Sequence, residues 1–307
     1  MPEPEILIIG AGPAGLTAGI YASRAGHHTL ILEKEMPGGQ MLKTTIIENY
    51  PGFAQPVNGL DLVQQMEAQA KKFGSQIEIG EAKKLRLLDQ GFELETTGNT
   101  YHPRSIIICT GASPRPLGLA NEKELTGRGI SYCAICDGPL YQGKEVAVVG
   151  GGDSALQEAD YLTRFCVRVH LIHRREEFRA VKVLQDRVRT NPKINLYLAH
   201  IITGINGTNR LESLELKNLK TGATTTVPVA GLFIYIGLIP DTGWCADIIK
   251  TDENGFIITD DKLQTTVPGI FAAGDVRQKE LRQIATAVGD GALAAMNAHD
   301  FCTRHKN

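Results

Sequence analysis

Apolar and amphipathic segments alternate near the start of the chain in a pattern that favours an α/β fold. The apolar run Ile6–Ile9 predicts a strand and leads into the glycine-rich segment 10–15, and a helical pattern then extends from about Ala14 to Arg24. A second strand, Thr29–Leu32, ends at Glu33. Strand, glycine turn and helix in this order are the context in which G-x-G-x-x-G indicates a dinucleotide site.

The same arrangement recurs in the middle of the chain. The apolar run Val146–Val149 enters a second glycine-rich segment, 150–155, followed by a predicted helix to about Arg164 and a strand over Val167–Ile172. Ala155 replaces the third glycine, which the fingerprint allows. One such motif alone is a tight turn without a ligand about as often as it is a nucleotide site. Two copies with the same spacing between glycine motif and second strand are poorly explained by coincidence.

The two copies differ in charge at the position that reads the ribose. Glu33 can accept hydrogen bonds from a free 2′-hydroxyl, as in the adenosine half of FAD, and would repel a 2′-phosphate. His173 stands at the same offset in the second copy and opens a basic run with Arg174, Arg175 and Arg179. A solvated charged face is the alternative interpretation, but guanidinium groups offer bidentate hydrogen bonds to a phosphate. The first copy is therefore predicted to bind FAD and the second NADPH.

Two stiff segments, Ser113–Pro116 and Gly237–Gly243, flank the second copy. We expect residues 1–114 and 244–307 to form a discontinuous FAD-binding domain, with 115–243 inserted as an NADPH-binding domain. The predicted fold class is α/β, with two Rossmann-like three-layer domains, the second inserted into the first.

The last part of the chain offers further contacts for a flavin. A strand from Ile270 runs into Gly274 and Asp275, and a helix of small residues is predicted from about Arg282 to Ala298. Asp275 could meet the ribitol and phosphate region, and the start of the helix could face the isoalloxazine ring. Taken alone, glycine followed by aspartate is more often just a turn.

Cys133 and Cys136 form a C-x-x-C pair inside the expected insertion, whereas the other four cysteines are widely scattered. Their spacing permits an intrachain disulfide, and in a reducing compartment such a pair is more often catalytic than structural. Half of a zinc site is the alternative, but the sequence has no second pair of ligands at the required spacing, and no metal site is expected.

Asp137 follows Cys136 directly and is a candidate proton donor for thiol–disulfide exchange. This role requires that burial raise the pKa of its carboxyl group. The alternative is an acidic residue that complements the dipole of a helix start.

Charge and hydropathy limit the classes of partner. The 32 Lys and Arg residues nearly balance 34 Asp and Glu residues, so we expect neither nucleic acid nor a membrane surface as a partner. The acidic start lacks the pattern of a signal peptide, and the apolar stretch Val227–Pro240 is too short to span a bilayer. We expect a soluble, cytoplasmic protein.

Taken together, these motifs resemble those of bacterial low-molecular-weight thioredoxin reductases over essentially the whole chain. The matching segments are 10–15, Gly38–Gln40, Glu48–Gly52, Cys133–Gly138, Gly150–Ala155, His173–Arg179, Gly274–Asp275 and Arg282–Gln283. The resemblance implies a homodimer in which NADPH reduces FAD and FAD reduces the cysteine pair, which passes electrons to thioredoxin or a related redoxin. It also implies that Cys136 faces the flavin and Cys133 attacks the substrate disulfide. Ile135 departs from the family, where threonine or valine is more common.

The motifs and the resemblance together assign residues to each cofactor. Those expected at FAD are Gly10, Gly12, Pro13, Ala14, Gly15, Glu33, Gly38, Gly39, Gln40, Asn49, Gly111, Gly274, Asp275, Arg282, Gln283 and Ile284. Those expected at NADPH are Gly150, Gly152, Asp153, Ser154, Ala155, His173, Arg174, Arg175 and Arg179.

Three other functions share parts of this pattern. A reductase of the same fold could serve another redoxin or a small-molecule disulfide. A ferredoxin–NADP reductase would need no cysteine pair. A nucleotide-binding redox sensor is a non-enzymatic alternative, and a yellow protein that NADPH bleaches would argue against it.

Overall fold

The computed structural model describes residues 3–43, 47, 49–89 and 91–305, so Glu48 of the resemblance lies outside the described residues. The chain divides into two compact units, residues 1–113 with 239–307 and residues 114–238. The second division falls after Leu238, whereas the sequence placed it after residue 243. The reason is local, because Thr110 Oγ1 donates to the carbonyl oxygen of Asp241 at 2.7 Å and ties this segment to the first unit.

The first unit is built on a parallel sheet of five strands in the order β18-β7-β1-β2-β3. Its strands are β1 (Ile6–Ile9), β2 (Thr29–Glu33), β3 (Gln76–Ile79), β7 (Ser105–Ile108) and β18 (Ile270–Ala272). Its helices are α1 (Pro13–Arg24), α2 (Gly59–Lys72) and α7 (Ile284–Arg304), with short 3₁₀ turns η1 (Gly39–Lys43) and η3 (Gly274–Val276). An antiparallel sheet consists of β4 (Ala82–Leu87), β5 (Phe92–Thr96) and β6 (Thr100–Tyr101).

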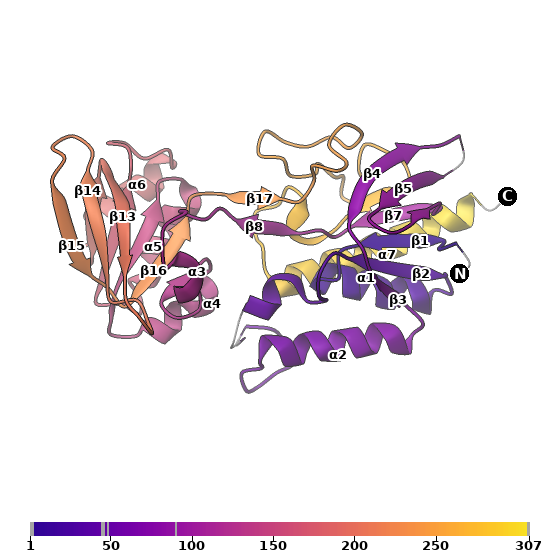
Figure 1. Ribbon diagram of the computed structural model, residues 1–307, viewed down its shortest axis with the longest axis horizontal. Helices are drawn as coiled ribbons and strands as arrows, with labels where there is room; N and C mark the ends of the chain where they lie inside the picture. Colours follow the sequence, from indigo (N-terminus) through magenta and orange to yellow (C-terminus); the bar gives the residue numbers. More distant parts are fainter. Residues whose placement is uncertain (1–2, 44–46, 48, 90, 306–307) are drawn as a thin grey trace. The chain divides into compact units, whose positions relative to one another are not determined.

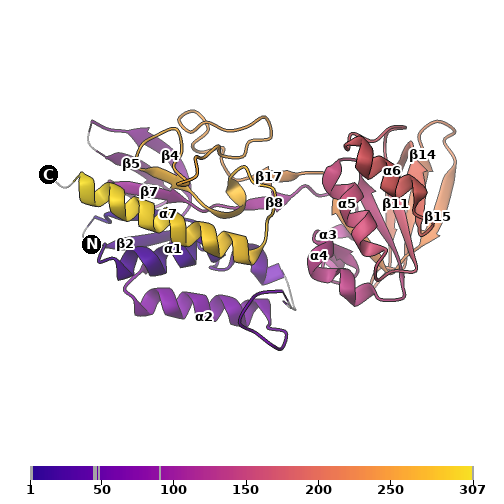
Figure 2. The same cartoon turned by 180° about the vertical axis from the view of Figure 1, so that it is seen from behind.

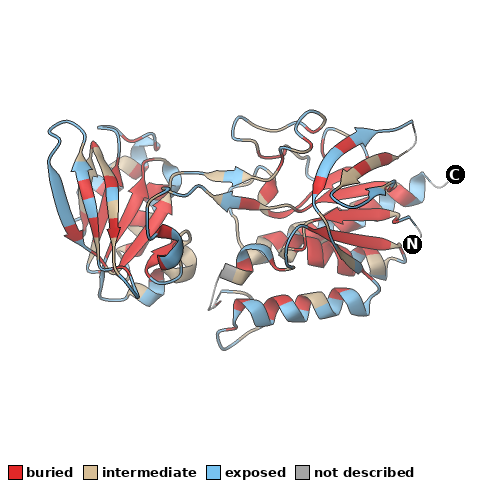
Figure 3. Ribbon diagram, in the orientation of Figure 1, coloured by how far each residue is buried: buried red, intermediate tan, exposed pale blue. Residues whose placement is uncertain are grey.

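These elements form three layers, with the helices on one face of the parallel sheet and the antiparallel sheet on the other (Figures 1 and 2). Side chains alternate along each strand, so Ile6 and Ile8 of β1 pack with the helices while Leu7 and Ile9 pack with β4 and β5. The central strands are thus buried on both faces, as Figure 3 shows. Helix α7 extends beyond the predicted end at Ala298 because Cys302 continues its buried stripe.

The second unit repeats this plan. Its parallel sheet has the order β12-β11-β10-β16-β9, from β9 (Ile130–Ser131), β10 (Glu145–Gly150), β11 (Arg168–His173), β12 (Ile194–Leu198) and β16 (Gly231–Tyr235). Its antiparallel sheet contains β13 (His200–Asn206), β14 (Ser213–Asn218) and β15 (Thr224–Pro228). Its helices are α3 (Glu122–Leu125), α4 (Ala134–Asp137), η2 (Gly138–Tyr141), α5 (Asp153–Leu162) and α6 (Lys182–Thr190).

The two connecting segments pair with each other as β8 (Ala112–Pro114) and β17 (Leu238–Pro240), a two-stranded ribbon. Proline is tolerated in these strands because neither lies in the centre of a sheet. The parallel sheets and helical layers of the two units confirm the α/β class and the Rossmann-like layers predicted for them.

Candidate redox centre and nucleotide sites

The first glycine motif forms a tight turn between β1 and α1. Gly10 has φ +103°, and a Cβ atom there would clash with the carbonyl oxygen of Cys109. A Cβ atom on Gly15 would clash with the carbonyl oxygen of Gly10, so this glycine lets α1 approach β1. Gly12 is the N-cap of α1, Pro13 and Ala14 open the helix, and no side chain of the described residues caps it. The amides of its first turn are therefore available to an anionic ligand.

Glu33 ends β2 and lies beside this turn. Its side chain is buried, with Oε2 accepting the amide hydrogen of Ala11 at 2.7 Å and Oε1 accepting that of Glu35 at 3.1 Å. The hydrogen bonds from these two amides orient the Glu33 carboxylate. Because its oxygens have further lone pairs, the carboxylate can still accept a hydrogen bond from a ribose hydroxyl.

A cavity of about 340 Å³ opens at Glu33, the residue predicted to bind a ribose hydroxyl. It is lined by Ile9, Gly10, Leu32, Glu33, Lys34, Gly80, Glu81, Ala82, Lys83, Thr110, Asp241, Gly243 and Trp244. Within the described part of the chain, the buried indole Nε1 of Trp244 has no hydrogen-bond partner. Such an orphaned donor is costly unless a ligand or water satisfies it.

The loops after β2 and β7 bring other expected FAD residues to this edge of the sheet. Gly38 donates its amide hydrogen to Ala11 O at 2.8 Å, and Gly39 and Gln40 follow in η1. Gly111 accepts the amide hydrogen of Asp241 at 3.2 Å. These contacts place the residues at the carboxyl ends of parallel strands, the usual position for a ligand in such sheets.

The loop between β18 and α7 carries the remaining FAD candidates. Burial raises the pKa of Asp275, and its buried Oδ1 has no hydrogen-bond partner among the described residues. A ligand hydroxyl, such as one of a ribitol chain, would satisfy this oxygen. The guanidinium carbon of Arg282 lies 4.2 Å from the centroid of the Phe256 ring. Gln283 is the N-cap of α7, which begins at Ile284. Asn49 Nδ2 donates to Gln283 Oε1 at 3.0 Å.

Sequence reasoning missed Asp290, which lies in the second turn of α7 and accepts hydrogen bonds from Gly274, Arg277 and Lys279. An acidic residue in a run of alanine and glycine is the only local signal for it, since these three donors belong to a separate loop.

The second glycine motif lies between β10 and α5. Gly152 is the N-cap of α5, and no described side chain caps the helix. Asp153 Oδ1 accepts the amide hydrogen of Val181 at 2.8 Å, Ser154 is exposed, and Ala155 is buried against the sheet. The first turn of α5 is thus a second candidate site for an anionic group.

His173 occupies the offset of Glu33, but its ring lies directly beneath the glycine turn, where a Cβ atom on Gly151 would clash with it. Its Nε2 lies 3.1 Å from the carbonyl oxygen of Glu177, and burial lowers its pKa. His173 therefore supports the turn as a neutral ring, and the charge of this site comes from the arginines.

The three arginines are exposed beside the second glycine turn. Arg179 donates its amide hydrogen to Gly151 O at 2.8 Å, which fixes its backbone at the turn. Among the residues that the structure describes, the guanidinium groups of Arg174, Arg175 and Arg179 form no ion pair or hydrogen bond. They are free to bind a phosphate.

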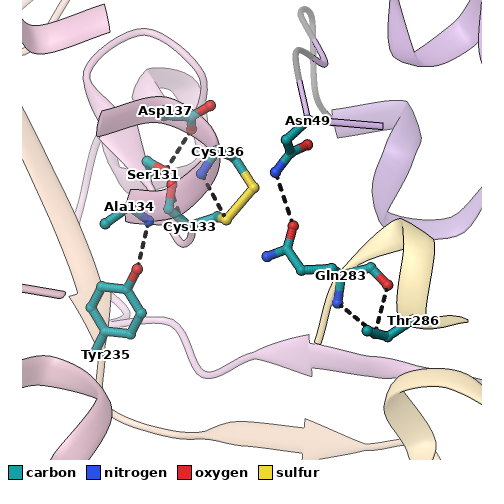
Figure 4. Close-up of a disulfide and its surroundings, with 9 residues drawn as sticks. All are labelled: Asn49, Ser131, Cys133, Ala134, Cys136, Asp137, Tyr235, Gln283 and Thr286. Carbon is teal, nitrogen blue, oxygen red and sulfur yellow. Dashed lines mark hydrogen bonds between the residues drawn. A yellow bond between two sulfur atoms is a disulfide. The ribbon is translucent and has the colours of Figure 1, made fainter. Parts of the chain in front are cut away.

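Cys133 and Cys136 form a disulfide across α4 (Figure 4). Cys133 is the N-cap of this short helix, and its Sγ accepts the amide hydrogen of Cys136 at 3.2 Å. The amide hydrogen of Ala134 goes to the hydroxyl oxygen of Tyr235 at 2.6 Å. Backbone amides of α4 thus donate to Cys133 Sγ and to the Tyr235 hydroxyl, and these two bonds hold the turn that carries the cysteine pair.

Asp137 ends α4 and accepts the hydroxyl hydrogen of Ser131 at 2.6 Å (Figure 4). Burial raises the pKa of its carboxyl group, and the bond from Ser131 opposes this increase. A proton donor beside the cysteine pair requires a carboxyl group with a raised pKa, and Asp137 meets this requirement.

The other four cysteines, Cys109, Cys166, Cys245 and Cys302, are buried free thiols. Burial raises the pKa of Cys166 and Cys302 to about 11 and that of Cys245 to about 12, which disfavours the reactive thiolate. In the described segments, no three His, Cys, Asp or Glu side chains gather in a way that could hold a metal ion. No helix of those segments is long and apolar enough to cross a membrane.

Known proteins resemble this chain over nearly its whole length. The family described as pyridine nucleotide-disulphide oxidoreductase matches residues 4–291. A thioredoxin reductase of Listeria innocua is 47% identical, covering 97% of this chain and 93% of the relative, and one of Bacillus subtilis is 43% identical, covering 97% and 94%. The crystal structure of thioredoxin reductase from Streptococcus pyogenes gives a TM-score of 0.92 at 43% identity and covers 98% of both chains.

Proposed function

Because the chain belongs to the thioredoxin reductase family of pyridine nucleotide-disulphide oxidoreductases, we propose that it carries electrons from NADPH through FAD to the Cys133–Cys136 disulfide and on to oxidised thioredoxin. Members of this family use FAD and NADPH. The proposal rests on the disulfide on α4 and on the partly buried carboxyl group of Asp137 beside it.

We assign FAD to the first unit and NADPH to the second. The cavity at Glu33 and the unpartnered oxygen of Asp275 support the first assignment. The free guanidinium groups at the turn after β10 support the second, because a 2′-phosphate distinguishes NADPH from NADH and is an anion that arginine binds well.

When bound, FAD supplies a two-electron carrier between NADPH and the disulfide. Reduction leaves a dithiol, and the Cys133 thiolate attacks one sulfur of oxidised thioredoxin, which forms a mixed disulfide and releases a thiolate of the partner. Cys136 then attacks Cys133 Sγ, so the enzyme disulfide re-forms and thioredoxin leaves as a dithiol. Asp137 supplies a proton to a departing thiolate. In total, one NADPH and one proton convert one disulfide into two thiols.

The test is an anaerobic titration of the purified holoprotein with NADPH, followed by addition of oxidised thioredoxin. We expect the yellow flavin absorbance to bleach and then to recover as thioredoxin is reduced. A panel of oxidised redoxins and small disulfides in the same assay identifies the preferred substrate. A flavin that NADPH does not bleach would contradict the proposal, and preference for another redoxin would change only the substrate.

We further propose that the enzyme is a cytoplasmic homodimer. The family resemblance motivates both assignments, and exposed apolar side chains on α7, Leu293 and Met296, offer a surface on which a second copy could pack. Light scattering should give twice the mass of one chain, and Leu293→Asp with Met296→Asp should lower it. A monomeric parent protein would contradict the dimer.

A further inference from the structure

Asp290 is the centre of a largely buried charge cluster in the first unit. Its Oδ2 accepts from Arg277 Nε and from Lys279 Nζ, both at 2.8 Å, and its Oδ1 accepts from Arg277 at 3.0 Å. The side chain of Lys279 is only 7% exposed and that of Asp290 12%. Burial alone would raise the pKa of Asp290, but the hydrogen bonds from Arg277 and Lys279 lower it overall. The carboxylate is therefore charged and paired with two cations.

The same carboxylate also holds the loop that precedes α7. Oδ2 accepts the amide hydrogen of Gly274 at 3.0 Å, and Gly274 is the residue before Asp275. The neighbour of Asp290, Gly291, lies so close to α1 that a Cβ atom there would clash with the carbonyl oxygen of Ala14. A Cβ atom on Gly274 would lie 2.9 Å from Cβ of Ala14. Asp290 thus stands where the loop meets the first turn of α1.

Asp275 keeps an unpartnered oxygen although cations lie near it. Lys279 and Arg282 are close enough to act on its carboxyl group electrostatically, yet Oδ1 of Asp275 makes no hydrogen bond among the described residues. Lys279 donates to Asp290 instead. Without Asp290, Arg277 and Lys279 would lose the acid with which they pair, and Lys279 would be left to interact with Asp275, on which it already acts electrostatically.

We propose that Asp290 is a positioning residue for FAD: by binding Lys279 and Arg277 and by holding the Gly274 amide, it keeps the Asp275 carboxylate free for the ligand. The inference rests on the proposed function, since it requires that the first unit bind FAD. It assigns Asp290 no contact with the reacting atoms.

The test is reconstitution of the flavin-free full-length protein with FAD, followed by flavin fluorescence and visible circular dichroism. Removing hydrogen bonds between charged groups should weaken FAD binding on the order of 10- to 100-fold in Asp290→Ala. The flavin circular dichroism should also change, which a purely structural role at the same folded fraction would not cause. Asp300→Ala is the matched control, because Asp300 is an exposed acid on the same helix whose ion pair with Arg304 is long, at 3.7 Å.

A double variant separates capture of Asp275 from general damage. Adding Lys279→Met to Asp290→Ala removes the cation that would pair with Asp275, so FAD affinity should partly recover. Where Asp290→Ala is insoluble, Asp290→Asn decides in the same assay, because it removes the charge with little change in shape. Wild-type affinity and circular dichroism in the Asp290 variants would overturn the inference, and failure of the double variant to recover affinity would overturn the capture step. Failure of the wild-type chain to bind FAD would overturn the proposed function itself.

Discussion

The hydroxyl oxygen of Tyr235 accepts the amide hydrogen of Ala134 at 2.6 Å. Tyr235 ends β16, and Ala134 directly follows Cys133, the first cysteine of the disulfide. The backbone of Tyr235 also lies against the second glycine turn, where a Cβ atom on Gly150 would clash with its carbonyl oxygen. One residue thus contacts both the turn that carries the cysteine pair and the second glycine turn of its unit.

Tyr235→Phe removes this hydroxyl and leaves the amide of Ala134 without its partner. A partly buried, unsatisfied amide costs about 1–3 kcal/mol, so α4 should be held less firmly. We expect turnover with thioredoxin to fall, on the order of several-fold, while NADPH reduces the flavin at its normal rate. Stopped-flow absorbance separates the two steps, and Tyr161→Phe is the control in the same unit. A parental turnover number and melting temperature in Tyr235→Phe would contradict the predicted support.

Asp137→Asn should lower turnover on the order of 100-fold or more, the usual loss when a general acid is removed. Because burial raises the pKa of this carboxyl group, the donor is protonated to a higher pH than a free aspartate. Its contribution to the rate should decline as the pH rises through that raised value. The pH profile of thioredoxin reduction checks this, and a profile that is unchanged in Asp137→Asn would exclude the role.

The same pKa shift predicts a change in stability with a defined sign. Between the pKa of the unfolded chain and the higher pKa of the folded one, the folded state binds more protons. The free energy of unfolding should therefore decrease as the pH rises through this window. Asp137→Asn should lack this component, which thermal melts of both proteins over that range would measure.

The two sulfurs are predicted to have different roles. Cys136→Ser should lose turnover, but its remaining Cys133 should form a mixed disulfide with a thioredoxin that lacks its resolving cysteine and carries an activated thiol. Cys133→Ser should retain a reducible flavin and should not trap the partner. Non-reducing gels of both mixtures decide the matter. Equal trapping by Cys136 would reverse the assignment without changing the enzyme class.

The exposed arginines are predicted to select NADPH. Replacing Arg174 and Arg175 with glutamine should raise the KM for NADPH strongly and leave turnover with NADH nearly unchanged. The loss corresponds to about 2–4 kcal/mol if two charge-assisted hydrogen bonds go. Steady-state kinetics with both cofactors measure it, and an equal loss with NADPH and NADH would argue for general damage to the site.

The amino-acid sequence determined the parts of this protein that depend on neighbouring residues. Strand β1 has the predicted bounds, and β10 differs from its prediction by one residue at each end, because apolar runs that end in glycine turns are local signals. The cysteine pair and Asp137 also lie within one helical turn, so their proximity could be predicted from spacing alone.

Contacts between distant segments were decided only by the tertiary structure. The bond between Tyr235 and Ala134 joins residues 101 positions apart, and that between Asp290 and Gly274 joins a helix to a separate loop. His173 shows the limit clearly, because the sequence gives its offset from the glycine motif, whereas only packing places its ring under Gly151. Periodicity indicates that a face is buried, but the partner of that face depends on how strands and helices pack in space. For that reason the sequence could identify the cysteines and glycine turns, whereas the residues that support them emerged only from the fold.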